Sequence, residues 1–345
     1  MIKLKPIALL SLCCLSLISC SRETVKSTDA SSIQRKALGK SSFASPQAEA
    51  DFAKGKAELE KGNNAIALKL FRQASEQGHA GAQNLLGLMY SLGKGVPKDQ
   101  QKAVKWLQQA ANQGLAEAQL NLGVMYHNGK GVTQNDQEAV TWIRKAAAQD
   151  YAPAQYNLGL AYLEGIGATQ SDQEAFKWFS KAADQNDPIA QNHLGLMYLN
   201  GKGVLQNDRE AIKWFKKAAE QGYPDAQFHL GIANLKGIGL RENHQEAFKW
   251  FSQAAKKGHP VAQYNLGIMY TTGETVTQDY QQAAQWFHRA AQQGYADAQF
   301  NLAVMLFGNK NATEESRQEG LKWLRQAAKQ GHPKAQAALD KMAVQ

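Results

Sequence analysis

The spacing of the tryptophans constrains the fold of this chain more than any other feature. Six of the seven tryptophans lie 36 residues apart, at Trp106, Trp142, Trp178, Trp214, Trp250 and Trp286, and Trp323 follows after 37 residues. A fixed period in this range is typical of stacked-repeat proteins, whose units bury their apolar faces against their neighbours. The repeated residues should therefore build the scaffold, and residues that vary between repeats are the candidates for function.

Residues 79–331 divide into seven blocks of this period, and each block predicts two short antiparallel helices. In the first block, Ala82, Leu86, Met89 and Tyr90 are spaced i, i+4, i+7 and i+8, which places them in one apolar stripe along a helix. A pair of glycines then recurs in most blocks. Glycine suits a chain that leaves a helix through positive φ, so this pair predicts the turn between the two helices.

The second helix of each block is predicted to open at a column of short polar residues: Asp99, Asn135, Ser171, Asn207, Asn243 and Asp279. All are good N-cap residues, and a glutamate or glutamine three positions later predicts a reciprocal capping box in five of the six blocks. Ala103, Trp106 and Ala110 form an apolar stripe along this helix. We therefore expect the tryptophans to pack in the core, rather than to form a row of ligand-binding rings.

The blocks share the pattern A-x-A-Q-x-x-L-G-x-M-Y-x-x-G-x-G-V, followed by A-x-x-W-x-x-x-A-A-x-Q-G. This pattern resembles Sel1-like repeats, the 36-residue relatives of the tetratricopeptide repeat. The resemblance implies an all-α, right-handed α-solenoid that serves as a protein-interaction scaffold, often in exported bacterial proteins. We expect a tetratricopeptide-like capping unit at 47–78 and a C-terminal capping helix at 332–345. The seventh block has lost its two-glycine turn and gained one residue, which predicts a displaced second helix.

The N-terminus predicts export and lipid attachment. Lys3 and Lys5 precede an apolar stretch at 7–18 that is too short to span a bilayer as a helix. A leucine at position −3 and a serine at −1 precede Cys20, which resembles the lipobox of bacterial lipoproteins, where the cysteine is acylated and the signal is cleaved before it. The resemblance implies a signal peptide at 1–19. The alternatives to a lipoprotein signal are an ordinary signal peptide that contains a cysteine by chance and an uncleaved membrane anchor.

Residues 20–46 contain many serines and few bulky apolar residues, so we expect the lipid-modified Cys20 to be followed by a flexible tether. Two or three acyl chains hold a protein on a membrane far better than one. Ser21, rather than aspartate, follows the cysteine, which in two-membrane bacteria favours sorting to the outer membrane. The expected location is thus the bacterial cell envelope, on the outer membrane, facing either the periplasm or the cell surface.

The residue types argue against most chemistries. All three cysteines, Cys13, Cys14 and Cys20, lie in the N-terminal segment, so the cleaved chain would have no thiol for a disulfide, a zinc site or catalysis. The disulfide-braced branch of the family has been described as β-lactamase-like, and its cysteines are missing here. The eight histidines are dispersed without metal-binding spacing. Ser91 begins an S-x-x-K match, which we interpret as a chance match at a helix end.

The net charge of +9 is spread along the chain, which favours a solvated surface over a site for acidic partners or anionic envelope polymers. The predicted export argues against nucleic acid as a binding partner. We expect no cofactor, no metal and no catalytic residue.

Two columns on the first helices vary between repeats and are predicted to line the groove that first helices form in tetratricopeptide-like superhelices. The aromatic column comprises Asn84, Leu120, Tyr156, Asn192, Phe228, Tyr264 and Phe300, and the asparagine column comprises Leu85, Asn121, Asn157, His193, His229, Asn265 and Asn301. Carboxamides both donate to and accept from a peptide backbone, and aromatic rings supply buried contact. The open alternative is that the asparagines bond to neighbouring repeats and the rings pack between first helices. A third column, always aliphatic, runs from Leu88 to Val304 and predicts packing.

The sequence therefore predicts an envelope scaffold that binds a protein or peptide, with no catalysis. Its partner-binding residues are predicted to be Asn121, Asn157, His193, His229, Asn265, Asn301, Tyr156, Phe228, Tyr264 and Phe300, with the groove centred on repeats 4 to 7. The alternatives are a β-lactamase-like or peptidoglycan-acting enzyme and an envelope glycan binder that uses the basic surface.

Overall fold

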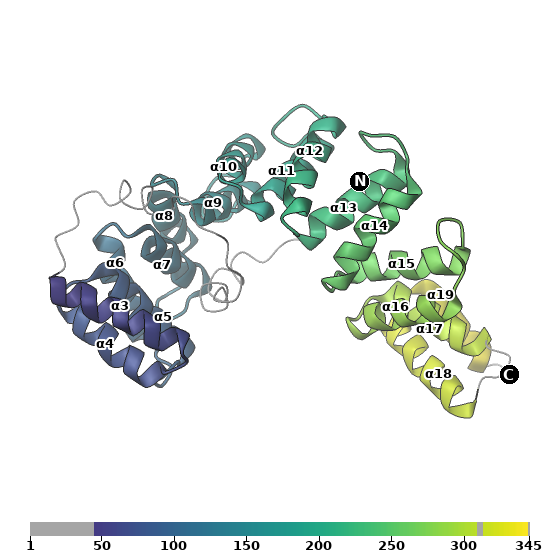
Figure 1. The fold of residues 1–345 in the computed structure, drawn as a ribbon, viewed down its shortest axis with the longest axis horizontal. Coiled ribbons are helices and arrows are strands. Elements are labelled where there is room, and N and C mark those ends of the chain that lie inside the picture. Colours follow the sequence, from purple (N-terminus) through teal and green to yellow (C-terminus); the bar gives the residue numbers. More distant parts are fainter. Residues whose placement is uncertain (1–44, 309–312, 344–345) are drawn as a thin grey trace. The chain divides into compact units, whose positions relative to one another are not determined.

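The computed structural model describes residues 45–308 and 313–343. Every regular element in these residues is an α-helix, labelled α3 to α19 in Figure 1, which confirms the all-α prediction. The predicted signal peptide, the lipid-modified Cys20 and the tether up to residue 44 lie outside the described residues, so these three remain predictions.

The helices alternate between first and second members of a repeat. The first helices are α3 (Pro46–Glu60), α5 (Ala80–Leu92), α7 (Ala116–Asn128), α9 (Ala152–Glu164), α11 (Pro188–Asn200), α13 (Pro224–Lys236), α15 (Pro260–Thr272), α17 (Ala296–Gly308) and α19 (Pro333–Ala343). The second helices are α4 (Asn64–Glu76), α6 (Gln100–Asn112), α8 (Asp136–Ala147), α10 (Asp172–Asp184), α12 (Asp208–Glu220), α14 (His244–Lys256), α16 (Tyr280–Gln292) and α18 (Glu314–Lys329).

The described chain divides into two compact units inside the fourth repeat, next to Ala190. The first unit contains α3 to α10, and the second contains most of α11 together with α12 to α19. In the first unit, each helix from α3 to α10 packs against the next one along the chain, and the same holds from α12 to α19 in the second. Each unit therefore has the consecutive packing of a solenoid.

The second helices begin where the N-cap column predicts. The capping side chains accept from the backbone N–H three residues later at 2.9–3.2 Å in all six helices, from α6 to α16. The reciprocal half of the capping box is replaced by another bond. The N–H of each cap donates to a carbonyl of the preceding first helix, as from Asp99 to Tyr90 at 2.9 Å. The cap therefore joins the two helices of a repeat, which local sequence signals did not reveal.

The innermost position of each second helix is the residue after the tryptophan, or after Leu70 in α4, which has no tryptophan. Phe71, Leu107, Ile143, Phe179, Phe215, Phe251, Phe287 and Leu324 are at most 1% exposed. Each faces the glycine column of the first helices or its equivalent. A Cβ at Gly267 would lie 2.5 Å from the Phe287 ring, so only glycine allows this approach. The prediction that the tryptophans fill the core is therefore corrected, since five of the seven are only half-buried.

The tryptophan rings lie at the border between core and solvent. Trp142 and Trp323 are the most buried, at 8% and 9% exposed. The Trp142 Nε1 donates to Glu138 at 2.9 Å, and the Lys145 ammonium lies 3.7 Å from its ring centroid. An indole has an apolar body and one polar N–H, so it fits this border, and the cation one turn later covers its outer face.

The seventh repeat keeps its packing despite the added residue. Helix α18 starts at Glu314 and is longer than the other second helices, while Leu324 remains 1% exposed in the buried column. The predicted displacement of this helix is therefore wrong, because the change in length falls before its buried face. At the other end, α3 begins at Pro46, one residue before the expected capping unit, with Ser45 as its N-cap.

A glutamine bracket, missed by the sequence interpretation, ties each first helix to the second helices beside it. Gln263 Nε2 donates to the Ala255 carbonyl at 3.1 Å, and Gln293 Nε2 donates to Gln263 Oε1 at 2.9 Å. Equivalent side-chain pairs join Gln113 to Gln83, Gln149 to Gln119, Gln185 to Gln155, Gln221 to Gln191 and Gln330 to Gln299. The invariant glutamine after the recurring alanine is therefore structural.

Candidate partner-binding surface

The predicted partner-binding residues lie on the first helices, as expected, but most of their polar atoms are engaged within the protein. Asn121, Asn157 and His193 are buried, at 3–7% exposed, and the other members of the set are half-buried. The helical period correctly placed them away from the Ala82 stripe. It could not show that the neighbouring first helix of the same unit packs against this face.

In the first unit, both asparagines bond within the fold. Asn121 Nδ2 donates to Asn84 Oδ1 on the preceding first helix at 2.9 Å, and Asn157 Nδ2 donates to the Pro153 carbonyl at 2.7 Å. The Tyr156 ring lies 5.6 Å from the Phe179 ring. Only the bond from Asn121 to Asn84 joins neighbouring repeats, as the alternative for this column expects, whereas the Asn157 bond lies within α9 and the Tyr156 contact lies within one repeat.

In the second unit, the asparagine column also forms internal bonds. His229 Nδ1 lies 2.9 Å from Asn192 Oδ1, and because a carboxamide oxygen only accepts, this nitrogen carries the proton. Asn265 Nδ2 donates to the Val261 carbonyl at 2.7 Å, and the Asn301 side chain bonds to the Tyr264 hydroxyl. Hydrogen bonds from this column to a partner would therefore have to use side-chain donors and acceptors that are not engaged in these internal bonds.

The aromatic column of the second unit keeps part of its surface open. Phe228, Tyr264 and Phe300 are half-buried on α13, α15 and α17. Phe228 stacks on His259 with ring centroids 4.6 Å apart, and Phe300 stacks on His332 at 4.7 Å. Because each ring rests on a residue of the next repeat, these aromatic side chains are held in place before any partner arrives.

A histidine motif that the sequence interpretation missed fixes those rings. His79, His259 and His332 cap α5, α15 and α19, and Nδ1 of each accepts from the N–H three residues later at 3.1 Å. The opposite nitrogen faces an acid near the start of the preceding first helix. It lies 3.1 Å from Glu49, 3.5 Å from Asp225 and 3.2 Å from Asp297, respectively. A histidine at the start of a block, with an acid and a phenylalanine near the start of the preceding first helix, is the signal that could have identified it.

Burial favours the uncharged forms of several titratable side chains near these rings. Burial, with smaller contributions from His259 and His193, lowers the pKa of His229 to about 3. Burial also lowers the pKa of His259, although Asp225 acts in the opposite direction. Burial and the neighbouring Asp297 charge raise the pKa of Tyr295 to about 12. At neutral pH the side chains of His229 and Tyr295 are therefore uncharged, while the carboxylates of Asp225 and Asp297 lie nearby.

Signs of other chemistry are sparse in the described part of the chain. The Ser91 hydroxyl lies 3.2 Å from Gln100 Oε1, to which it donates. Residues 45–308 and 313–343 contain no group of three or more potential metal ligands. None of the helices in these ranges is both long enough and apolar enough to cross a membrane.

Comparison with known sequences identifies the family. The model described as Sel1 repeat matches eight consecutive segments, at 52–79, 80–115, 116–151, 152–187, 188–223, 224–259, 260–295 and 296–332. The chain belongs to the Sel1 repeat family. The first matched segment falls in the region that we expected to be an N-terminal cap, so this Sel1 repeat protein has one more recognisable repeat than the tryptophans mark.

Two solved structures resemble this Sel1 repeat protein over most of its length. One is c5321, a protective antigen present in uropathogenic Escherichia coli strains. It is 36% identical, with a TM-score of 0.72 over 92% of this chain and 67% of the antigen. The other is a Sel1 repeat protein from Oxalobacter formigenes, 33% identical, with a TM-score of 0.69 over 95% of this chain and 93% of that protein. No curated protein sequence matches the chain. The fold is thus a Sel1-repeat scaffold, an architecture typical of protein–protein interaction.

Proposed function

We propose that this Sel1 repeat protein is a lipid-anchored scaffold of the bacterial envelope that binds a protein or peptide partner and catalyses no reaction. The observation that carries the proposal is the half-buried aromatic column of the second unit. Phe228 and Phe300 are held by stacking on the capping histidines, and Tyr264 packs 5.2 Å from Tyr295. Aromatic side chains that are already ordered bind a partner at little entropic cost, which is why such residues dominate protein interfaces.

The anchor and the lack of catalysis rest on different support. The anchor rests on the lipobox resemblance that ends at Cys20. The non-catalytic role is supported by the engagement of the most perturbed residues in structural bonds, because His229 pairs with Asn192 and His259 caps α15. A strongly shifted pKa marks a catalytic group only when that group faces a site where a substrate can react.

The proposal is tested by capture of a partner from envelope extract with the full-length chain in mild detergent. We compare wild type with a Phe228→Ala, Tyr264→Ala double variant. The matched control is a Leu205→Ala, Tyr280→Ala variant, which truncates exposed apolar side chains away from the column. Circular dichroism establishes that each variant is folded, and a Tyr264→Phe variant keeps the ring while removing only its hydroxyl.

The expected result is one discrete protein that wild type and the control variant retain and the column variant loses. Capture that is unchanged in the column variant would place the binding surface elsewhere. Capture of no protein by wild type, or hydrolysis of a chromogenic β-lactam that a Ser91→Ala variant loses, would overturn the scaffold proposal.

A further inference from the structure

The C-terminal end of the second unit has an apolar cavity where the packing of the inner repeats is not completed. Helix α19 repeats the first-helix register, because Ala335, Gln336 and Leu339 follow Ala298, Gln299 and Leu302 by 37 residues. However, it carries Ala337 and Ala338 where the aromatic and asparagine columns would continue. The large side chains that fill these positions in other repeats are therefore missing.

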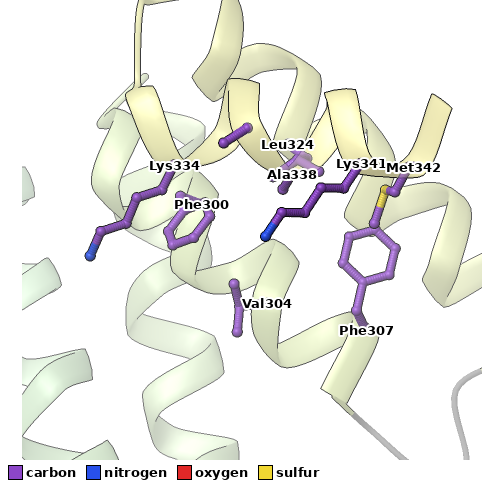
Figure 2. A pocket seen from close by; sticks show the side chains of 9 residues that line it. Phe300, Val304, Phe307, Leu324, Lys334, Ala338, Lys341 and Met342 are labelled. Atoms are coloured by element: carbon purple, nitrogen blue, oxygen red, sulfur yellow. The ribbon is translucent and has the colours of Figure 1, made fainter. Parts of the chain in front are cut away.

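The cavity has a volume of about 320 Å³ and lies between α17, α18 and α19 (Figure 2). Phe300, Val304 and Phe307 of α17 line it, together with Leu324 of α18 and Met342 of α19. Val304 is 50% exposed, whereas its equivalent Leu160 in the aliphatic column is 2% exposed. The aliphatic column was expected to serve only in packing, and this expectation fails at its last residue, Val304. This volume suits one or two side chains.

Two lysines border the cavity. Lys334 lies at one end, beside Phe300, and Lys341 reaches across toward Val304 (Figure 2). Within the described residues neither lysine belongs to an ion pair. In the register of the first helices, Lys334 stands where Asp225 and Asp297 bind the histidine of the next repeat. The acid of the inner repeats is therefore replaced by a cation at the last one.

We propose that this cavity binds a partner segment that inserts one bulky apolar side chain between two acidic ones. The lysines are seven residues apart on one helix, or about 10 Å along its axis. A peptide in the polyproline II conformation rises about 3.1 Å per residue and completes a turn in three residues, so carboxylates at positions i and i+3 would lie on one side of it, about 9 Å apart, with the apolar residue between them in sequence. A fatty acid or a single lipid headgroup offers only one anion and would leave one lysine unmatched. This inference rests on the proposed function and specifies which side chains the partner segment would carry.

The test uses fluorescence anisotropy of a labelled peptide, GSDFSEGS, with the full-length chain. The comparison peptides are GSNFSQGS, which keeps the shape without the charges, and GSDASEGS, which lacks the ring. The protein variants are Ala337→Tyr, which restores the aromatic column and fills the cavity, and Lys334→Gln with Lys341→Gln. A Lys322→Gln, Lys329→Gln variant on exposed positions of α18 is the charge-matched control.

We expect GSDFSEGS to bind to the wild-type protein and Ala337→Tyr to abolish this binding. Because Ala337 is exposed, a tyrosine at this position should not reduce the stability of the protein. The Lys334 and Lys341 double variant should weaken binding about threefold to tenfold, because solvent-exposed ion pairs are individually weak. The α18 control should bind within about twofold of wild type. Loss of the phenylalanine should weaken binding at least about tenfold.

The inference is overturned if GSNFSQGS binds as well as GSDFSEGS, or if Ala337→Tyr leaves binding intact. It is also overturned if anionic-lipid vesicles bind more tightly than the peptide and Ala337→Tyr abolishes that binding. Capture of an envelope protein that depends on Phe228 and Tyr264 but not on Ala337→Tyr would uphold the proposed function while rejecting this cavity. Binding of the peptide in the cavity without capture of any envelope protein would uphold the cavity as a binding site and reject the proposed function.

Discussion

At the scale of single residues, the glutamine bracket shows how an invariant polar residue can be structural. The exception is in the fifth repeat, where Lys257 stands in place of the bracket glutamine and donates to the Gly222 carbonyl at 2.7 Å. Gln227 Oε1 is consequently buried without a hydrogen-bond partner. An unsatisfied buried acceptor costs about 1–3 kcal/mol, so this repeat interface is expected to be weaker than the others.

Completing the bracket should stabilise the protein. We expect Lys257→Gln to raise the free energy of unfolding by about 1 kcal/mol, because the new amide can donate to Gln227 Oε1. The exposed bond from Lys257 to Gly222 contributes little in return. Urea unfolding measures the change, and Gln293→Lys in the next repeat should shift it by a similar amount in the opposite direction. Equal stability of both variants and wild type would show that the bracket contributes nothing.

The buried histidine of the asparagine column predicts a loss of stability in acid. The folded-state pKa of His229 is about 3, below the ordinary value of 6.5. The unfolded chain therefore binds a proton that the folded chain does not, so this contribution is complete above pH 6.5 and is lost as the pH falls toward 3. The slope is at most about 1.4 kcal/mol per pH unit.

A His229→Asn variant separates this histidine from the other titrating groups. Asparagine already occupies the same column at Asn265 and Asn301, so the variant should fold. Between pH 6.5 and 5.0 it should lose up to about 2 kcal/mol less stability than wild type in urea unfolding. Identical pH profiles for the two proteins would mean that His229 titrates normally in the folded state.

At the scale of elements, the close approach of the two helices in a repeat depends on glycine opposite a large ring. Gly195, Gly231 and Gly267 would each place a Cβ within 2.4–2.6 Å of a phenylalanine ring atom. The seventh repeat shows the compensated form of this contact, because Ala303 replaces the glycine and the smaller Leu324 replaces the ring. The two positions therefore pack directly against each other, although Gly87 and Gly123 face the aliphatic Leu107 and Ile143 instead of a ring.

This pairing predicts a compensated double substitution. Gly267→Ala should destabilise the protein by about 1–2 kcal/mol, because overpacking outweighs the better helix propensity of alanine. Adding Phe287→Leu should recover part of that loss, since it recreates the pair found in the seventh repeat. Gly308→Ala is the control, because nothing lies within 4 Å of its Cβ position. Thermal unfolding measures all three, and an unchanged Gly267→Ala would contradict the packing argument.

At the scale of the whole molecule, binding and attachment are assigned to separate parts of the chain. The candidate binding surfaces lie on first helices of the second unit, whereas attachment is assigned to Cys20 at the opposite end of the sequence. We expect Cys20→Ser to move the protein from the membrane fraction to the soluble envelope fraction, because acyl chains supply the anchor. Immunoblotting of fractionated cells measures this change. A variant that stays with the membranes would contradict lipid anchoring through Cys20.

The repeat period, the helix pairs and the N-caps were all predictable, because each depends on residues within one helix or one turn. Asn135 caps α8 through an atom three residues away, and Gly129 ends α7 with a left-handed backbone. Sequence alone also led to the family, since the recurring pattern covers most of the chain. These features depend on residues that are close together in the sequence, so they can be predicted from the sequence alone.

Only the tertiary structure decided which member of each inner stripe is buried and what covers the variable columns. Trp178 and Phe179 are neighbours on one helix and both are apolar, and only the approach of a glycine on the first helix selects the phenylalanine. Likewise, the bond from Asn121 to Asn84 joins residues on different first helices. The helical period determines the direction of a side chain, whereas its burial depends on neighbours brought together by folding.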